Sequence, residues 1–381
     1  MIYLDNSAAT IPDEEVLKTF TKASSAYFGN PSSLHKLGGE ASALLEKARE
    51  KAAELLEAEQ HQVLFTSGAT ESNNLAVQGT AYARQNRGKH VVVSSLEHPS
   101  ILEAVAYLER EGWDVTRVSP QMNGDVTAQS VKRALREDTV LVCMMHVNNE
   151  TGAILPAEEV GLMLKRYPRI HYHVDAVQAV GKIPVSFRTI GADSLSISAH
   201  KIHGLKGTGL LVYRDTRNLT PLFFGGAQES GIRAGTENPA GAAAAVKALR
   251  LAVSNRPEHA AHMRDLNVQL ETFFKERKEV VINSPAQRAP HIINVSCPGR
   301  KAETVVHALE QREIYISTTS ACSSRVSNES SVLKEMGADQ SVAESAVRIS
   351  LSGRTTAEEI GSFMKAWEQT VPEVTLAKGA K

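Results

Sequence analysis

The sequence predicts an α/β protein with a doubly wound, mostly parallel β-sheet in a large domain and a smaller α+β domain beside it. Between about residues 40 and 215, short apolar runs rich in β-branched residues alternate with segments of helical periodicity. Apolar strands separated by helices are typical of a sheet that is covered by helices on both faces. After about residue 255 this alternation ends.

The first predicted element is a helix over residues 41–56, where apolar side chains recur at helical spacing and Lys and Glu occupy the other face. Further helices are predicted at 101–111, 128–136 and 156–167, between short β-rich runs. Those runs predict strands at 62–66, 90–94, 114–118, 139–147, 170–174, 193–198 and 209–213. The Ala-rich segment 240–253 predicts a closely packed helix.

The remaining chain predicts the smaller domain. A long polar helix at 258–278 comes first, and no segment rich in Pro, Gly and Ser marks a linker before it. The other expected elements are strands at 280–283, 292–296 and 315–317 and helices at 301–311 and 356–370. We expect a large domain at 15–255 and a small domain formed by 1–14 and 256–381.

Composition excludes several classes of protein. The 381 residues include 42 Lys and Arg against 43 Asp and Glu, so bulk charge provides no attraction to nucleic acid or to an anionic membrane. Three cysteines are too few for a disulfide framework and suit a reducing compartment. The first residues lack the pattern of a signal peptide, and the longest apolar runs are too short for a membrane span. We expect a soluble, cytoplasmic protein.

The residues that follow the predicted strands are the candidate ligand-binding residues, because ligands bind beyond the carboxyl ends of strands in such sheets. Small and hydroxyl residues at 66–70 precede a helix, which is typical either of a phosphate cradle or of an ordinary N-cap. His98, Asp175 and Lys201 each follow another strand. Taken singly they could be a loop histidine, a helix cap and a surface lysine.

Together these residues match the needs of pyridoxal phosphate, which requires a phosphate site, a carboxylate for its ring nitrogen and a Schiff-base lysine. His200 and His203 lie three residues apart, but no Cys or carboxylate ligand accompanies them, so zinc is disfavoured.

An ordered set of motifs extends almost from end to end of the chain. It comprises residues 3–6, 28–35, 66–74, 97–98, 148–152, 175–178, 196–209, 233–238, 320–324 and 348–354. With these motifs the chain resembles the cysteine desulfurases of the NifS/IscS type, in the aminotransferase class V group of pyridoxal-phosphate enzymes. The resemblance implies a fold-type-I architecture and a homodimer.

The resemblance also implies roles for residues around the cofactor. Lys201 would form the Schiff base, Asp175 would keep the ring nitrogen protonated, and Gln178 would contact the phenolic oxygen. His98 would stack on the ring and handle protons. The implied phosphate ligands are Ala69, Thr70, Ser198, His200 and, from the other subunit, Thr236.

Three residues are implied to bind the carboxylate of L-cysteine: Asn149, Arg354 and Asn30. Asn149 is also implied to contact the cofactor.

By the same resemblance, Cys322 is the sulfur-transfer residue, on an extended loop of small polar residues. Its thiolate would take sulfur from L-cysteine, leaving L-alanine and a persulfide for an acceptor protein. The candidate acceptors are an iron–sulfur scaffold, a tRNA-thiolating enzyme and a carrier of cofactor biosynthesis. No resident metal is implied, only transient contact of Cys322 with an iron–sulfur cluster. Cys143 and Cys297 lie in apolar patterns and are expected to pack as small hydrophobic residues.

Two alternatives stay open at this stage. The same scaffold could support another pyridoxal-phosphate reaction, such as that of a selenocysteine lyase or an aminotransferase, although an aminotransferase needs no thiol. The chain could instead be a sulfur-relay scaffold that is activated by a partner.

Overall fold

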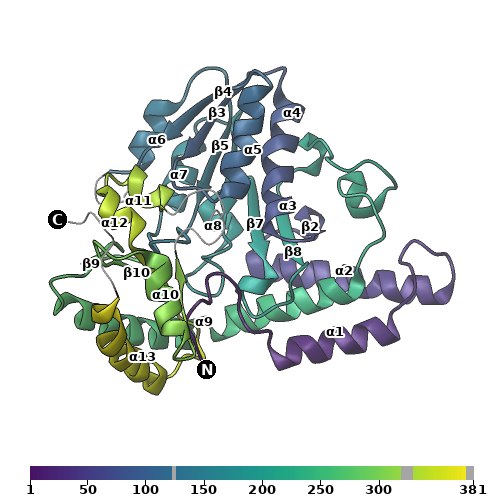
Figure 1. The fold of residues 1–381 in the computed structure, drawn as a ribbon. Coiled ribbons are helices and arrows are strands. Elements are labelled where there is room, and N and C mark those ends of the chain that lie inside the picture. Colours follow the sequence, from purple (N-terminus) through teal and green to yellow (C-terminus); the bar gives the residue numbers. More distant parts are fainter. Residues whose placement is uncertain (122–125, 319–328, 375–381) are drawn as a thin grey trace.

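A computed structural model of the chain describes residues 1–121, 126–318 and 329–374 (Figure 1). Its helices are Glu14–Ala26 (α1), Lys36–Leu56 (α2), Ala69–Asn74 (α3), Thr80–Arg84 (α4), Pro99–Arg110 (α5), Ala128–Ala134 (α6), Ala157–Leu164 (α7), Phe187–Ile190 (α8), Pro239–Lys275 (α9), Ala302–Glu310 (α10), Ser331–Glu335 (α11), Gln340–Glu344 (α12) and Ala357–Thr370 (α13). Within these described ranges, no helix combines the length and apolarity needed to cross a membrane.

The larger sheet has the strand order β2-β8-β7-β6-β5-β3-β4. Strand β8 is antiparallel to both of its neighbours, and the other adjacent pairs are parallel. The strands are Val63–Thr66 (β2), His90–Ser94 (β3), Asp114–Val118 (β4), Thr139–Met145 (β5), His171–Asp175 (β6), Ser194–Ser198 (β7) and Gly209–Tyr213 (β8). The prediction of a mostly parallel sheet is confirmed.

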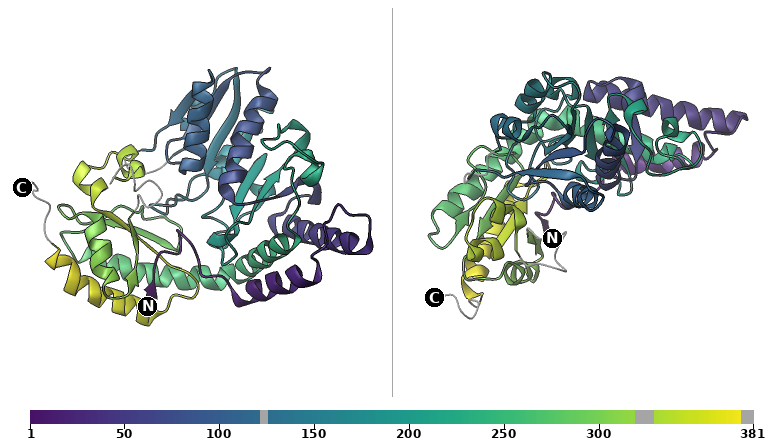
Figure 2. Two further views of the ribbon diagram at one scale, coloured as in Figure 1. Left: turned by 45° about the vertical axis from the view of Figure 1, so that its right-hand side comes forward. Right: turned by 90° about the horizontal axis from the view of Figure 1, so that it is seen from above.

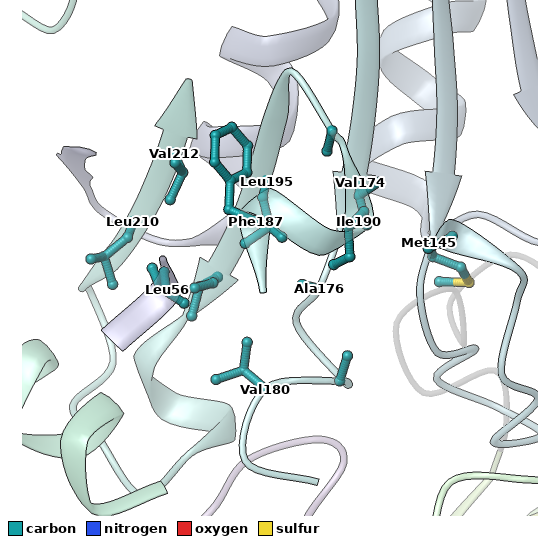
Figure 3. Close-up of a cluster of buried hydrophobic side chains, with 14 of the residues drawn as sticks. Leu56, Met145, Val174, Ala176, Val180, Phe187, Ile190, Leu195, Leu210 and Val212 are labelled. Atoms are coloured by element: carbon teal, nitrogen blue, oxygen red, sulfur yellow. The ribbon is translucent and has the colours of Figure 1, made fainter. Parts of the chain in front are cut away.

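Helices pack on both faces of this sheet because its strands are apolar on both sides. Val92 and Val142 belong to a cluster that includes residues of α2, α6, α7, α8 and α9, part of which is drawn in Figure 3. Val91 and Val93 belong to a second cluster, with residues of α4 and α5. Successive side chains of a strand point to opposite faces, so these clusters lie on opposite sides, as a doubly wound sheet requires.

A smaller antiparallel sheet, with the order β12-β13-β10-β9, lies in the other part of the molecule (Figures 1 and 2). Leu4 packs in its core with residues of α9, α10 and α13, and β1 pairs with β11. The strands outside the larger sheet are Ile2–Tyr3 (β1), Val281–Ile282 (β9), Ile292–Ser296 (β10), Ile314–Tyr315 (β11), Ser317–Thr318 (β12) and Ala346–Ser350 (β13). The first residues of the chain thus pack beside the smaller sheet. The domain limits stay a prediction.

Helix α9 differs from the sequence prediction of two separate helices, because it is continuous across Pro257. Its first half is buried in the core of the larger sheet and its second half, from Met263, in the core of the smaller one. No residue between Leu249 and Met263 is fully buried. One helix therefore connects both cores, which explains why the sequence contains no linker.

Candidate active site

Three of the predicted site residues, Asp175, Lys201 and His98, gather at one edge of the larger sheet. Strand β2 is antiparallel to β8, which is antiparallel to β7, so β2 runs in the same direction as β7, β6, β5 and β3. Asp175 ends β6, Lys201 ends the short turn after β7, and His98 caps α5 after β3. These are the carboxyl ends of the strands, where sheets of this kind bind ligands.

Asp175 is a buried carboxylate that accepts two hydrogen bonds. Its Oδ1 accepts from the backbone N–H of Val177 at 2.9 Å, and its Oδ2 accepts from the Asn73 amide at 2.8 Å. Only 5% of the residue is exposed. Both oxygens therefore accept from donors of the chain, and a carboxylate held in this way can pair with a protonated ring nitrogen.

His98 is the N-cap of α5, and its Nδ1 accepts from the Ser100 backbone N–H at 3.1 Å. The same nitrogen lies 2.9 Å from the Ser100 hydroxyl. Burial lowers the pKa of His98, nearby Lys201 lowers it further, and Asp175 opposes both effects. The residue is therefore neutral near pH 7, with Nδ1 occupied by donors.

Lys201 is held by the N-terminal segment of the chain. Its Nζ donates to the carbonyl oxygens of Ser7 and Ala8 at 2.6 and 2.7 Å. Thr10 secures the segment, since its backbone N–H and its hydroxyl both donate to the carbonyl of His200. Sequence reasoning missed this role of residues 7–10, because backbone carbonyls leave no signal in the residue types.

The segment before α3 forms a turn that only glycine accommodates well. Gly68 has a φ of 155°, and a Cβ there would lie 3.8 Å from Ser198 Oγ. Ser198 Oγ is 2.9 Å from Nδ1 of His200, whose pKa burial lowers to about 4. The first N–H groups of α3, around Ala69 and Thr70, lack helical partners, as at every helix start. The loop therefore offers donors to an anion.

Gln178 and Asn149 also lie near this edge. The Gln178 amide donates to the carbonyl of Ser7 at 3.0 Å, and its Oε1 lies 3.2 Å from Nε2 of His291. The Asn149 loop is shaped by Asn148, whose Oδ1 accepts the backbone N–H groups of the two residues after Asn149.

Two arginines differ in their relation to Asn149. Arg354, the predicted carboxylate ligand, is exposed and pairs with Asp13. Arg348 is 4% exposed, donates to the Asn149 carbonyl at 2.8 Å and has a buried Nε without a hydrogen-bond partner. Sequence reasoning assigned no role to Arg348, although it lies inside a quoted motif.

Asn30 and Thr236 are both exposed on the single chain. The Asn30 side chain accepts from Ser32 N at 2.9 Å. Thr236 lines, with Ser67, a cavity of about 270 Å³. No described contact joins either residue to Asp175 or Lys201.

Cys322 lies outside the described residues. The other two cysteines are buried, as expected: Cys143 in the core on one face of the larger sheet and Cys297 in the core of the smaller one. Burial raises the pKa of Cys143 well above its usual value and that of Cys297 to about 11. Both are therefore thiols at neutral pH and poor nucleophiles.

Within the described ranges, no three His, Cys, Asp or Glu side chains are grouped so as to hold a metal ion.

Comparison with known proteins gives consistent relatives. Residues 2–363 match the family described as aminotransferase class V. A NifS/IcsS protein homolog from Lactobacillus delbrueckii subsp. bulgaricus is 44% identical over 372 residues, 97% of each chain. The cysteine desulfurase IscS of Dictyoglomus turgidum is 38% identical over 98% of this chain and 95% of its own. A solved NifS-like protein superposes with a TM-score of 0.91 at 36% identity, covering 97% and 98% of the two chains.

Proposed function

The chain belongs to the aminotransferase class V family and, within it, to the cysteine desulfurases of the NifS/IscS type, and we propose that it transfers sulfur from L-cysteine to Cys322 with pyridoxal phosphate as its cofactor. The supporting observation is the convergence of Lys201, Asp175 and His98 on one edge of the sheet. The products are L-alanine and a persulfide on Cys322.

The residues present fit the cofactor. The glycine turn before α3 and the Ser198–His200 pair suit its phosphate, and Asp175, a buried acceptor with donors on both oxygens, suits a protonated ring nitrogen. Lys201 is the amine for the covalent link. When bound, pyridoxal phosphate supplies an electron sink that stabilises negative charge at the substrate α-carbon.

Lys201 also serves as the base of the reaction. When it is not linked to the cofactor, its Nζ would accept the α-proton of the substrate. The carbonyls of Ser7 and Ala8, which accept from Nζ in this structure, orient the amine.

Cys322 performs the sulfur transfer as a thiolate. Its Sγ attacks the substrate sulfur, a new S–S bond forms, and the substrate C–S bond breaks with its electron pair left on the substrate. That fragment takes a proton and leaves as L-alanine. The two buried thiols, Cys143 and Cys297, cannot substitute for Cys322, because burial keeps both protonated.

The substrate carboxylate is bound by Asn149 and an arginine. Arg354 and Asn30 remain assigned by resemblance, and Arg348 joins them as a candidate because it is buried against Asn149. Arg348 suits the role, since its guanidinium retains an unpaired Nε.

The assembly and location belong to the same proposal. The protein is a cytoplasmic homodimer in which Thr236 reaches the phosphate site of the other subunit. Acceptor proteins, an iron–sulfur scaffold or a tRNA-thiolating enzyme, receive the sulfur. The domain limits are 15–255 for the large domain and 1–14 with 256–381 for the small one.

The test is turnover of L-cysteine by the purified full chain, with alanine release measured. With a thiol reductant present to remove the persulfide sulfur, the wild type and a Cys297→Ala control should release alanine over many cycles. Cys322→Ser should bind the cofactor and lose turnover. Unchanged turnover in Cys322→Ser would refute the assigned role. A chain that binds no cofactor would refute the proposal as a whole.

A further inference from the structure

A buried chain of hydrogen bonds extends behind Asp175 into the sheet. It links residues of four elements: His171 and His173 of β6, Ser194 of β7, Asn73 of α3 and Ser100 of α5. Asn73, His173 and Ser194 have no exposed surface. Polar groups buried to this degree must satisfy one another, so the direction of each bond can be worked out.

His173 sets the direction. Its Nε2 lies 3.0 Å from Asn73 Oδ1 when the amide is oriented with its nitrogen toward Asp175. An amide oxygen can only accept a hydrogen bond. The His173 proton is then on Nε2. Burial lowers the pKa of His173 to about 3, so the ring is neutral and its Nδ1 is bare. That nitrogen, 2.8 Å from Ser194 Oγ, accepts the serine proton. Ser194 Oγ in turn accepts from His171 Nε2 at 2.8 Å.

The other orientation of the Asn73 amide is excluded by Asp175. It would direct Oδ1 at the carboxylate Oδ2, which lies 2.8 Å from the Asn73 nitrogen. Two acceptors at that distance repel each other. Asp175 Oδ1 already accepts from the Val177 N–H, and Asn73 Oδ1 faces His173, so the amide nitrogen donates to Asp175 Oδ2.

The second N–H of the same amide leads to His98. It donates to Ser100 Oγ at 2.9 Å, and the serine proton then points to His98 Nδ1, also at 2.9 Å. The Ser100 backbone N–H donates to the same Nδ1. With Nδ1 occupied by two donors, neutral His98 carries its proton on Nε2.

We infer that Asn73 is a positioning residue of the reaction: held by His173, its amide donates one hydrogen bond to the Asp175 carboxylate and one to Ser100, which fixes His98 as the Nε2–H tautomer. One side chain thus sets the state of two groups that the proposed function uses. The role toward the cofactor rests on that proposed function, whereas the tautomers of His98 and His173 are properties of the chain itself.

The first test reads the tautomers in the full chain labelled with ¹⁵N-histidine, using long-range ¹H–¹⁵N correlation. Signals are assigned by their loss in His98→Gln and His173→Gln. Near neutral pH, both residues should be neutral with the proton on Nε2. A proton on Nδ1 of either ring would overturn the inference. This result is independent of desulfurase activity, so the chain of bonds can stand even where the proposed function fails.

The second test uses Asn73→Leu, which has similar volume and no amide. A buried Nε2–H of His173 would lose its acceptor, so its proton should move to Nδ1 and donate to Ser194. The Asp175 carboxylate would lose a charge-assisted donor, and kcat should fall about 10- to 100-fold with a smaller change in KM. Lower thermal stability with unchanged histidine signals and kcat would mean a purely structural role and would overturn the inference.

The matched control is Asn74→Ala, the next residue of the same helix, whose amide donates only to backbone carbonyls. Its histidine signals and kcat should match those of the wild type.

A third measurement serves if Asn73→Leu does not fold. Ser100→Ala removes one donor from Nδ1, so the pKa of His98 should rise, whereas Ser100→Thr should leave it unchanged. The charged groups that act on His98, Asp175 of β6 and Lys201 after β7, are the same in both variants. Equal pKa values of His98 in the two variants would overturn the inference.

Discussion

Arg348 and Asp5, which lie 343 residues apart in the chain, form an ion pair with 2.9 Å between Nη2 and Oδ1. The pair joins β13 to the N-terminal segment whose Ser7 and Ala8 carbonyls hold Lys201. Through its other terminal nitrogen, Arg348 also contacts Asn149. A single guanidinium therefore connects three segments that meet at the site.

Replacement of Arg348 by Lys should weaken substrate binding. The Arg348 guanidinium is planar: its two terminal nitrogens contact Asp5 and Asn149, and its Nε remains available to a carboxylate. A lysine ammonium cannot reproduce this set of donors. We expect KM for L-cysteine to rise about 10- to 100-fold, the value of a lost charge-assisted bond. Arg354→Lys, at an exposed side chain, is the comparison. A larger effect at Arg354 would restore the assignment made from sequence.

The stability of the protein should depend on the charge of Glu150. Burial raises the pKa of this carboxyl to about 7, although Ser330 Oγ, 2.5 Å away, and Arg348 oppose the shift. The folded state then holds a proton that the unfolded chain releases near its ordinary pKa of about 4.3. Stability therefore falls as the pH rises from about 4.3 to 7, by about 3 to 4 kcal/mol in total.

Glu150→Gln removes this titration. Urea denaturation at pH 5 and pH 8 should show a smaller difference in the free energy of unfolding for the variant than for the wild type. Glu14→Gln, at an exposed residue, is the control and should retain the wild-type difference. An equal difference in Glu150→Gln would contradict the assigned charge state.

Gly209→Ala should damage the proposed phosphate site at the turn before α3. A Cβ at this position would lie 2.6 Å from the Cα of Gly68, whose backbone already adopts a conformation that favours glycine. The turn before α3 would have to move, and we expect cofactor affinity to fall at least about 10-fold, as for loss of one anion contact. Gly361→Ala is the control, since its Cβ meets nothing within 4 Å. Equilibrium dialysis measures the affinity of each variant for the cofactor.

Phe274→Ala should destabilise the smaller core. The Phe274 ring packs edge-on against Trp367, with 4.9 Å between centroids, and has no exposed surface. Truncation of such a side chain costs about 3–5 kcal/mol. Val268→Ala, on the exposed side of the same helix, should change the free energy of unfolding by less than about 0.5 kcal/mol. Equal effects in denaturant titration would refute this account of the core.

Much of the fold was predictable because the strands of the larger sheet are short, apolar runs between helices. Prediction of β5 was wrong at its end, which the sequence placed at residue 147 and the structure at Met145. The predicted break in α9 was also wrong, since burial in two cores stabilises one helix across Pro257. Helix α1 and strand β13 were not predicted.

The sequence could suggest Lys201, Asp175 and His98 because each residue type implies a reaction, and the structure places all three at one edge of the sheet. Asn73 carried no such signal, because an asparagine near a helix start is typical of an exposed surface. Its role depends on how α3 packs against β6 and β7, a contact between segments about 100 residues apart. The role of Thr236 depends on a second subunit. The roles of Thr236 and Asn30 both remain predictions.

The most direct test of the account is the mass of the Cys322 peptide after the full chain has been mixed with L-cysteine and alkylated without reductant. We expect one added sulfur on that peptide, accompanied by alanine, and no added sulfur on the peptides of Cys143 or Cys297. Alanine release without added sulfur on Cys322, or sulfur on a buried cysteine in its place, would contradict the claim that Cys322 receives the sulfur.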